Sequence, residues 1–247
     1  MAIRAPLLEG LPVTTILPLI ENKLLSQLSE HDLELLGPIQ RVELAPHHAL
    51  EVADRPIDSI YFIERGLASI VADSDDGGLI EVGLIGPEGM TGLAVVHGAE
   101  TTPFSTIVQT AGTAIRVEPD ALRNAIIRSQ SLQALLMRYA RAFAVQIAST
   151  ASANGQLLLE ERLARWLLMV ADRVGDSFQV THEFLAMMLS VRRAGVTRAL
   201  RDLESKGLIR AMRGAVAIAD RDGLIAYTHG AYGLAEREYQ SLIGHQH

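Results

Sequence analysis

The stretch from Ala186 to Ile209 limits what this chain can fold into more than any other part of it. Apolar residues recur there at spacings of three and four in two consecutive short blocks, which predicts two amphipathic helices joined by a tight turn. The residues that form the two apolar faces are Leu185, Met188 and Leu189 in the first helix and Val196, Ala199, Leu200 and Leu203 in the second. The pattern predicts a helix-turn-helix.

Positive charge is concentrated on the same segment. Between Arg192 and Arg213 there are seven basic side chains and two acidic ones, a local net charge of +5, while the whole chain carries −7. Residues 1–159 hold 10 basic and 18 acidic side chains, whereas residues 160–229 hold 11 and 9. A basic element on an otherwise acidic protein is typical of phosphate binding, so we predict that this part of the chain binds DNA.

Local features around the two helices support this interpretation. Thr181 stands where an N-cap is needed, and Glu183 lies in the first turn, where a negative charge favours the helix dipole. Gly207 is placed to end the second helix. Residues 208–218 then predict a short hairpin around Arg213-Gly214, which we interpret as a wing.

At these residues the chain resembles the Crp/Fnr family of bacterial transcription regulators. The family's usual run, Ala-x-x-Leu-Gly-Val-Ser-Arg-Glu-Thr-Val-x-Arg-x-Leu-x-x-Leu-Glu-x-x-Gly-Leu-Ile, aligns with Ala186 to Ile209 without a gap. The resemblance extends from about Asn22 to Thr228 and is more specific at its C-terminal end. Arg193 and Arg198 match family arginines that face bases or phosphates in the major groove. The candidate DNA-binding residues are Thr181, Arg192, Arg193, Thr197, Arg198, Arg201 and Arg213.

Four positions depart from the family run. Ser190 replaces the turn glycine, Arg192 the capping serine, Ala194 the base-reading glutamate and Gly195 the threonine that follows it. Without the glutamate, the second helix lacks an acceptor for cytosine N4. We therefore expect an operator that differs from that of the cyclic-AMP-dependent members.

The first half of the chain has a different pattern of apolar and turn-forming residues. From Ile39 to Val117, short apolar stretches alternate with turn residues, and Asp73 to Gly78 has the composition of a hairpin turn. Strands of this length predict a small barrel or sandwich, and the resemblance implies the double-stranded β-roll of cyclic-nucleotide-binding domains. The expected fold class is therefore α+β: an N-terminal β-roll, a long dimerisation helix and a C-terminal winged helix-turn-helix.

A stripe of apolar residues at spacings of three and four predicts one long helix from about Ser131 to Ala153. Such a stripe can pack on the β-roll, but the resemblance favours a two-fold dimer seam. The seam residues are Leu132, Leu136, Tyr139, Phe143, Ile147 and Thr150. Asn154-Gly155 then marks an expected hinge. The predicted boundaries are an arm at 1–20, the sensor at 21–130, the dimerisation helix and hinge at 131–156, the winged helix-turn-helix at 157–229 and a tail at 230–247.

The resemblance also implies where an effector would bind. In the family, a glutamate holds the ribose of the cyclic nucleotide and an arginine neutralises its phosphate. Here Gly92 stands at the glutamate position and Phe104 at the arginine position, so we expect that cyclic AMP does not bind. The candidate effector pocket comprises Gly92, Phe104, Ser105, Thr106 and Tyr139. His97 lies near the position of a haem-ligating histidine in one branch of the family, and we interpret it as a loop residue.

The sequence offers little for catalysis or cofactor chemistry. With no cysteine among 247 residues, disulfides, thiolate metal sites and cysteine nucleophiles are excluded. His182-Glu183 begins like a zinc-protease helix, but Ala186 occupies the place of the second histidine. We expect a non-enzymatic, cytoplasmic protein that holds no cofactor or metal and does not span a membrane.

The expected partners are double-stranded DNA and a second copy of the chain, with RNA polymerase and an unidentified small-molecule effector as further candidates. The alternative is a β-roll module that senses a ligand or binds a protein without touching DNA. That alternative leaves the charge reversal after residue 159 unexplained.

Overall fold

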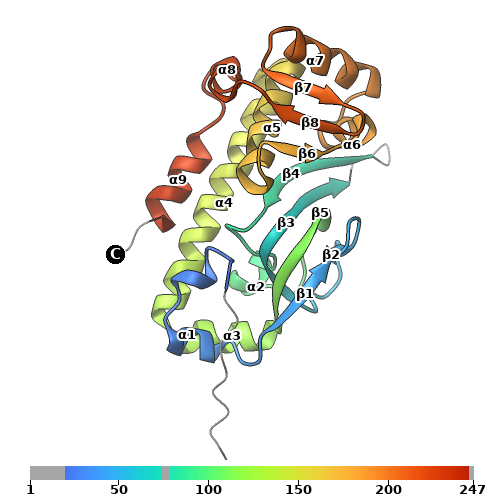
Figure 1. Ribbon diagram of the computed structural model, residues 1–247. Helices are drawn as coiled ribbons and strands as arrows, with labels where there is room; N and C mark the ends of the chain where they lie inside the picture. The colour runs from blue at the N-terminus through green and yellow to red at the C-terminus, as the bar shows by residue number, and fades with distance from the viewer. Residues whose placement is uncertain (1–19, 74–77, 245–247) are drawn as a thin grey trace, which may run out of the picture.

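The computed structural model describes residues 20–73 and 78–244. The predicted N-terminal arm, except for its last residue, and the centre of the Asp73–Gly78 turn lie outside these residues. Figure 1 shows a sheet-containing unit, a long helix that runs along it and a smaller helical unit at the far end of that helix. The expected α+β fold class, with an N-terminal sheet unit and a C-terminal helix-turn-helix, is confirmed.

The N-terminal unit is built around a five-stranded antiparallel sheet in the order β1-β5-β3-β4, with β2 also paired to β5. Two short helices precede the sheet: the 3-10 helix η1 (Leu25–Gln27) and α1 (Glu30–Leu35). The strands are β1 (Gln40–Leu44), β2 (Ala49–Glu51), β3 (Ile60–Asp73), β4 (Leu79–Ile85) and β5 (Ser105–Val117).

The two long strands are bent, which explains why the sequence suggested several shorter ones. The β3–β5 register shifts between Ile63 and Ala68, and Gly66 lies in this interval with φ +91°. A Cβ on Gly112 would lie 1.9 Å from the carbonyl oxygen of Arg65. Glycine therefore allows the two strands to approach closely at the bend. The apolar stretches at residues 60–63 and 68–71 are two halves of the single strand β3.

The short helix α2 (Leu93–Val96) lies between β4 and β5, and α3 (Pro119–Arg128) and the 27-residue α4 (Gln130–Gln156) follow β5. The start of α4 is fixed by Ser129, whose Oγ accepts a bond from Leu132 N and donates to Asp32 at 2.5 Å. The long helix expected from about Ser131 to Ala153 is confirmed. None of the helices in the described part of the chain has the combination of length and apolarity needed to cross a bilayer.

The expected hinge at Asn154-Gly155 is misplaced, because both residues lie inside α4 and the chain leaves the helix at Leu157. A glycine near an exposed helix end costs only about 1 kcal/mol relative to alanine, so it need not break the helix.

The C-terminal unit contains four helices and a three-stranded antiparallel sheet in the order β6-β8-β7. Its elements are α5 (Leu159–Val174), β6 (Ser177–Gln179), α6 (His182–Met188), α7 (Arg193–Ser205), β7 (Ile209–Met212), β8 (Ala215–Ile218) and α8 (Arg221–Tyr227). The predicted hairpin at 208–218 is present as β7–β8. Trp166 of α5 lies in the core of this unit and is 6% exposed.

The segment expected as a tail contains another helix, α9 (Leu234–Ile243). Figure 1 shows α9 running back beside α4, away from the C-terminal unit. Its Ile243 is 1% exposed and belongs to the apolar core of the sheet unit. Its apolar residues Ala235, Tyr239, Leu242 and Ile243 recur at helical spacings, a pattern that the expectation of a tail overlooked.

The two units share an apolar core. Leu67, Val71 and Leu84 of the sheet pack in the same cluster as Leu163 and Leu167 of α5. The C-terminal unit therefore lies directly against the sheet, in addition to being joined to it through α4.

Candidate nucleic-acid interface

Helices α6 and α7 form a helix-turn-helix whose ends are set by local interactions. The Oγ1 of Thr181 accepts a bond from Phe184 N at 3.1 Å, so Thr181 caps α6 as its sequence position predicted. Helix α7 starts at Arg193 and ends before Gly207, which adopts φ +75°. The buried face of α7 comprises Val196, Ala199, Leu200 and Leu203, as predicted.

The turn between the helices contains an uncommon backbone conformation. Ser190 has φ +50°, in the left-handed region that glycine adopts without strain. The Val191 amide donates to the carbonyl of Ala186 at 2.9 Å, which closes the turn. Ser190 therefore follows the backbone path that the family's glycine would favour, at some cost in strain.

The outer face of this unit is basic. The structure leaves Arg192, Arg193, Arg198 and Arg201 exposed around α7, and Arg213 exposed at the tip of the β7–β8 hairpin. Thr181 is also exposed, and Thr197 is half-buried. All seven candidate DNA-binding residues thus belong to α6, α7 or the wing, or directly precede one of these helices.

The acidic side chains within the basic segment are engaged by neighbours. Asp202 accepts from Lys206 and from Tyr227 Oη, and these bonds hold the pKa of the Asp202 carboxyl below its usual value. Glu204 accepts from the backbone amide of Ala211 at 2.8 Å. Among the described residues, no ion pair involves Arg192, Arg198, Arg201, Arg210 or Arg213. These guanidinium groups are therefore available for phosphates and base edges.

Arg193 is an exception, because its Nε lies 2.5 Å from Oε1 of Glu183. Both side chains are more than 60% exposed, so the pair is easily broken, and it orients Arg193 without burying it. Thr197 Oγ1 lies 3.0 Å from Nδ1 of His182 and donates to the carbonyl of Arg193. The side chains of α6 and α7 thus hold one another in place at the exposed surface.

The candidate effector residues fall into two places. Gly92 and Thr106 meet at Glu51, whose carboxylate accepts from Gly92 N at 3.0 Å and from Thr106 Oγ1 at 2.5 Å. Ser105 Oγ accepts from Ala53 N, and Phe104 is 40% exposed. Tyr139, in contrast, is buried on α4, and its Oη accepts from Met90 N at 3.2 Å.

Glu51 was missed by the sequence reasoning. It is 8% exposed, and burial raises the pKa of its carboxyl, while the bonds from Thr106 and Gly92 oppose that rise. The carboxyl group of Glu51 therefore occupies the hydrogen-bond donors of Gly92 and Thr106 in the sheet unit. No signal in the sequence set this glutamate apart, because its partners lie 41 and 55 residues away.

The predicted seam residues of α4 are divided by burial. Leu132, Leu136, Tyr139 and Phe143 are between 1% and 5% exposed within a single chain, so they face the chain's own core. Ile147 is 36% exposed and Thr150 is half-buried. The solvent-facing row of α4 consists instead of Ala134, Met137, Arg141, Ala144, Ala148 and Ala151, at alternating spacings of three and four.

Two polar contacts join the C-terminal unit to the sheet unit, and no sequence pattern indicated either of them. Trp166 Nε1 donates to Oε1 of Glu81 at 2.8 Å. Arg173 donates from Nε to Oε1 of Glu88 at 2.8 Å, and its second terminal nitrogen lies 2.7 Å from the same oxygen. These contacts let the sheet influence how the helix-turn-helix is oriented.

Comparison with known proteins agrees with this geometry. Residues 161–227 match the model of the Crp-like helix-turn-helix domain. A CRP-like cAMP-activated global transcriptional regulator of Mycobacterium tuberculosis is 27% identical over 203 residues, which covers 77% of this chain and 88% of that protein. Residues 161–227 thus form a Crp-like helix-turn-helix domain, and most of the chain is similar to a Crp-type transcription regulator.

Solved structures of Crp/Fnr regulators have the same architecture as this chain. A CRP-family regulator from Thermus thermophilus superposes with a TM-score of 0.65 at 21% identity, covering 78% of this chain and 98% of that one. FixK2 from Bradyrhizobium japonicum gives a TM-score of 0.67 at 15% identity, covering 79% and 98%. At these identities the likeness establishes the fold.

Proposed function

We propose that this chain is a Crp/Fnr-type regulator that acts as a homodimer on a roughly palindromic operator. The observation that carries the proposal is the row of exposed arginines on α7, backed by Arg213 at the wing. Two such helices, related by a two-fold axis, would enter successive major grooves about 34 Å apart. Because the proposed operator lies in genomic DNA, we propose that the protein is cytoplasmic.

The roles of the DNA-facing residues follow from their positions. Arg192 and Arg193, at the N-terminal end of α7, are assigned to base edges, where an arginine fork can bind guanine O6 and N7. Thr181, Thr197, Arg198 and Arg213 are assigned to phosphates, which fix the register of the protein on the duplex. Arg201, further along the exposed face, completes the basic surface.

A second copy of the chain is proposed to pack against the solvent-facing row of α4. Ala144, Ala148 and Ala151 are small, so another helix can approach closely along them. Next to this row lies a groove of about 640 Å³ that includes Ser149 and Leu234, and Leu234 is 53% exposed. Of the seam residues predicted from the sequence, Ile147 and Thr150 lie at the edge of this proposed seam.

We further propose that cyclic AMP does not control this regulator, although the M. tuberculosis relative is named as cAMP-activated. A Cβ on Gly92 would lie 2.1 Å from Cδ1 of Ile60, so the position has no room for a ribose-binding glutamate. Phe104 supplies no guanidinium, and the carboxylate of Glu51 already holds the donors of Gly92 and Thr106. An incoming phosphate would compete with the Glu51 carboxyl group for these donors.

Selection of genomic fragments by the purified protein tests the proposal. We expect enrichment of a roughly palindromic motif and binding that weakens steeply with salt, because phosphate contacts release counterions. No enrichment over fragments held on heparin would favour the alternative, a β-roll module that does not bind DNA. Transcription with purified RNA polymerase on an enriched promoter then tests polymerase as a partner.

A further inference from the structure

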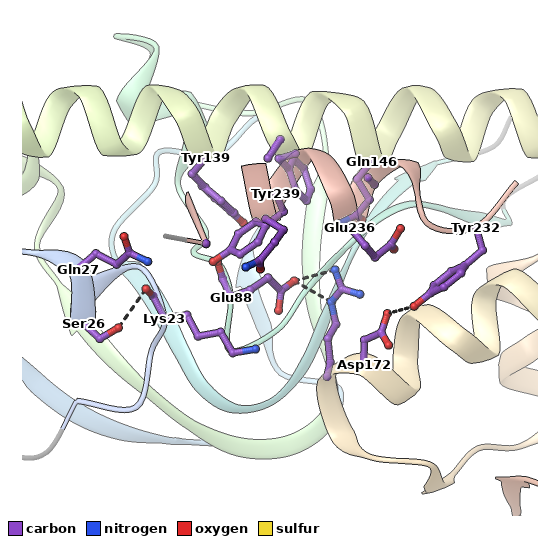
Figure 2. Close-up of a pocket in the computed structure, with 16 residues that line it drawn as sticks. Lys23, Ser26, Gln27, Glu88, Tyr139, Gln146, Asp172, Tyr232, Glu236 and Tyr239 are labelled. Carbon is purple, nitrogen blue, oxygen red and sulfur yellow. Dashed lines mark hydrogen bonds and ion pairs between the residues drawn. The ribbon is translucent and has the colours of Figure 1, made fainter. Parts of the chain in front are cut away.

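A cavity of about 560 Å³ lies where the sheet unit, α5 and α9 meet. The sheet unit contributes Lys23 and Glu88, α5 contributes Asp172 and Arg173, and α9 with its preceding loop contributes Tyr232, Glu236 and Tyr239. In the view of Figure 2, Lys23 lies at the lower left and Glu236 at the upper right, with Glu88 between them. The volume is in the range that small-molecule sites occupy.

Helix α9 is held firmly as one wall of this cavity. Tyr239 Oη donates to the carbonyl of Glu88 at 2.9 Å, and Gln27 Nε2 donates to the carbonyl of Ile243 at 2.8 Å. Arg141 of α4 pairs with Glu238 at 3.0 Å. The cavity is therefore bounded by helices and a packed loop, which gives it a defined shape.

Most charges that line the cavity are neutralised by neighbours. Glu88 is paired with Arg173, and Asp172 is paired with Arg221. In the part of the chain that the structure describes, Lys23 has no side-chain partner, and Glu236 makes no ion pair within 4 Å. One oxygen of Glu236 accepts from Gly233 N at 3.0 Å. The lining thus offers one available cation and one available carboxylate.

The uncharged part of the lining includes four aromatic side chains, Phe143, Tyr139, Tyr232 and Tyr239, together with polar residues such as Gln27, Gln146 and Gln240. The three tyrosine hydroxyl groups are already engaged, by Met90, Asp172 and Glu88 respectively. The tyrosine side chains therefore offer ring surface to a ligand, and recognition of charged groups is left to Lys23 and Glu236.

We propose that this cavity binds a zwitterion of the amino-acid type with a flat, apolar side chain. Its carboxylate would face Lys23, its ammonium group would face Glu236, and its side chain would lie against the aromatic lining. A simple anion would gain only Lys23 and would meet the carboxylates of Glu88, Asp172 and Glu236. A simple cation would gain only Glu236 and would meet Lys23 and Arg173.

Such a ligand would touch three parts of the molecule at once. Helix α5 is the first helix of the DNA-binding unit, and α9 follows that unit in the sequence. A bound ligand therefore stabilises the arrangement of α5, α9 and the sheet unit that fits it best. This regulatory step rests on the operator binding proposed above, whereas ligand binding itself does not.

Calorimetry on the full-length protein without DNA tests the site. The probes are L-phenylalanine, 2-phenylethylamine and 3-phenylpropionate, which share a skeleton and differ in charge. We expect L-phenylalanine to bind at least about tenfold more tightly than either analogue, since each lacks one charged contact. At about ten times its Kd it should raise the melting temperature by about 3–6 °C. Absence of binding at millimolar concentration, or equal binding of all three probes, would overturn the proposal.

Two variants locate the site, and one serves as a control. Lys23→Gln and Glu236→Gln should each weaken L-phenylalanine binding at least about tenfold. The glutamine at 236 can still accept from Gly233 N, so the fold of α9 is kept. Glu238→Gln, on the same helix but paired with Arg141 outside the cavity lining, should leave the affinity unchanged. Unchanged affinity in both Lys23→Gln and Glu236→Gln would refute the assignment. A ligand-dependent change in operator affinity tests the regulatory step separately.

Discussion

The indole of Trp166 and the carboxyl group of Glu81 share a 2.8 Å hydrogen bond across the boundary between the two units. Glu81 also accepts from Ser69 Oγ at 2.5 Å, and both residues are buried. A single carboxyl group thus bonds to the sheet on one side and to the DNA-binding unit on the other. The protonation state of this group affects how stably the units are held together.

The first prediction concerns the pH dependence of stability. Burial raises the pKa of Glu81 to about 7, although Ser69, Trp166 and the charges of Arg173 and Arg165 oppose the rise. The folded protein therefore keeps a proton that the unfolded chain releases near pH 4.5, and the free energy of unfolding falls as the pH rises from 4.5 to about 7. The loss should be about 3 kcal/mol.

Glu81→Gln should remove this fall, since the amide can accept from Trp166 and donate to Ser69 without titrating. Urea unfolding at about pH 5 and about pH 8 measures the effect. Glu34→Gln, an exposed change on α1, should retain the slope of the unaltered protein. A Glu81→Gln variant with that same slope would contradict the prediction.

The second prediction concerns DNA recognition. Arg193→Ala should weaken specific binding by about 1–3 kcal/mol and relax the sequence preference, because a base contact is lost. Arg198→Ala should weaken binding to all sequences and reduce the salt slope by about 1, as expected for a phosphate contact. Site selection and salt titration measure both. The exposed Arg128→Ala on α3 is the control, and an unchanged motif for Arg193→Ala would disprove its assignment.

The features that could be predicted from the sequence are those that depend on interactions between residues close together in the chain. Helix α7 and the cap at Thr181 depend on residues a few positions apart, and both were predictable. Glu81 and Trp166 are 85 residues apart, and Tyr239 and Glu88 are 151 apart. Contacts of this kind are set by how the units pack, so periodicity and capping cannot indicate them.

The seam on α4 shows a related limit. Large apolar residues mark the face of a helix with the strongest periodicity, and here that face, including Leu136 and Phe143, packs on the chain's own core. The solvent-facing row is made mainly of alanines, which contribute little to an apolar pattern. The sequence therefore predicted the helix correctly but could not decide which face a partner would use.

The third prediction concerns the strained turn. Ser190→Gly should raise the free energy of unfolding by about 0.5 kcal/mol, because relief of the left-handed strain exceeds the added entropy of glycine in the unfolded chain. Ser190→Val should lower it by about 1–2 kcal/mol, since a β-branched residue is poorly suited to φ +50°. Urea unfolding of the three proteins gives the order, and a valine variant as stable as the glycine variant would contradict it.

The fourth prediction concerns assembly. Ala148→Arg places a long charged side chain in the middle of the proposed seam and should convert the dimer to a monomer in sedimentation experiments. Phe143→Ala should instead destabilise the fold by about 3–5 kcal/mol, because the ring is buried within one chain. Asn124→Arg, on the exposed surface of α3, should leave the dimer intact. Persistence of the dimer in Ala148→Arg would place the seam elsewhere.

The last prediction concerns the β-roll. Phe104→Arg restores a guanidinium at the position where the family neutralises the phosphate, yet it should not create micromolar affinity for cyclic AMP. Glu51 still holds Gly92 N and Thr106 Oγ1, and Gly92 still supplies no carboxylate for the ribose. Calorimetry with cyclic AMP on the unaltered protein and on Phe104→Arg measures this directly. Micromolar binding by the unaltered protein would show that the donors around Glu51 can be released to a nucleotide, and the proposed independence from cyclic AMP would then be wrong.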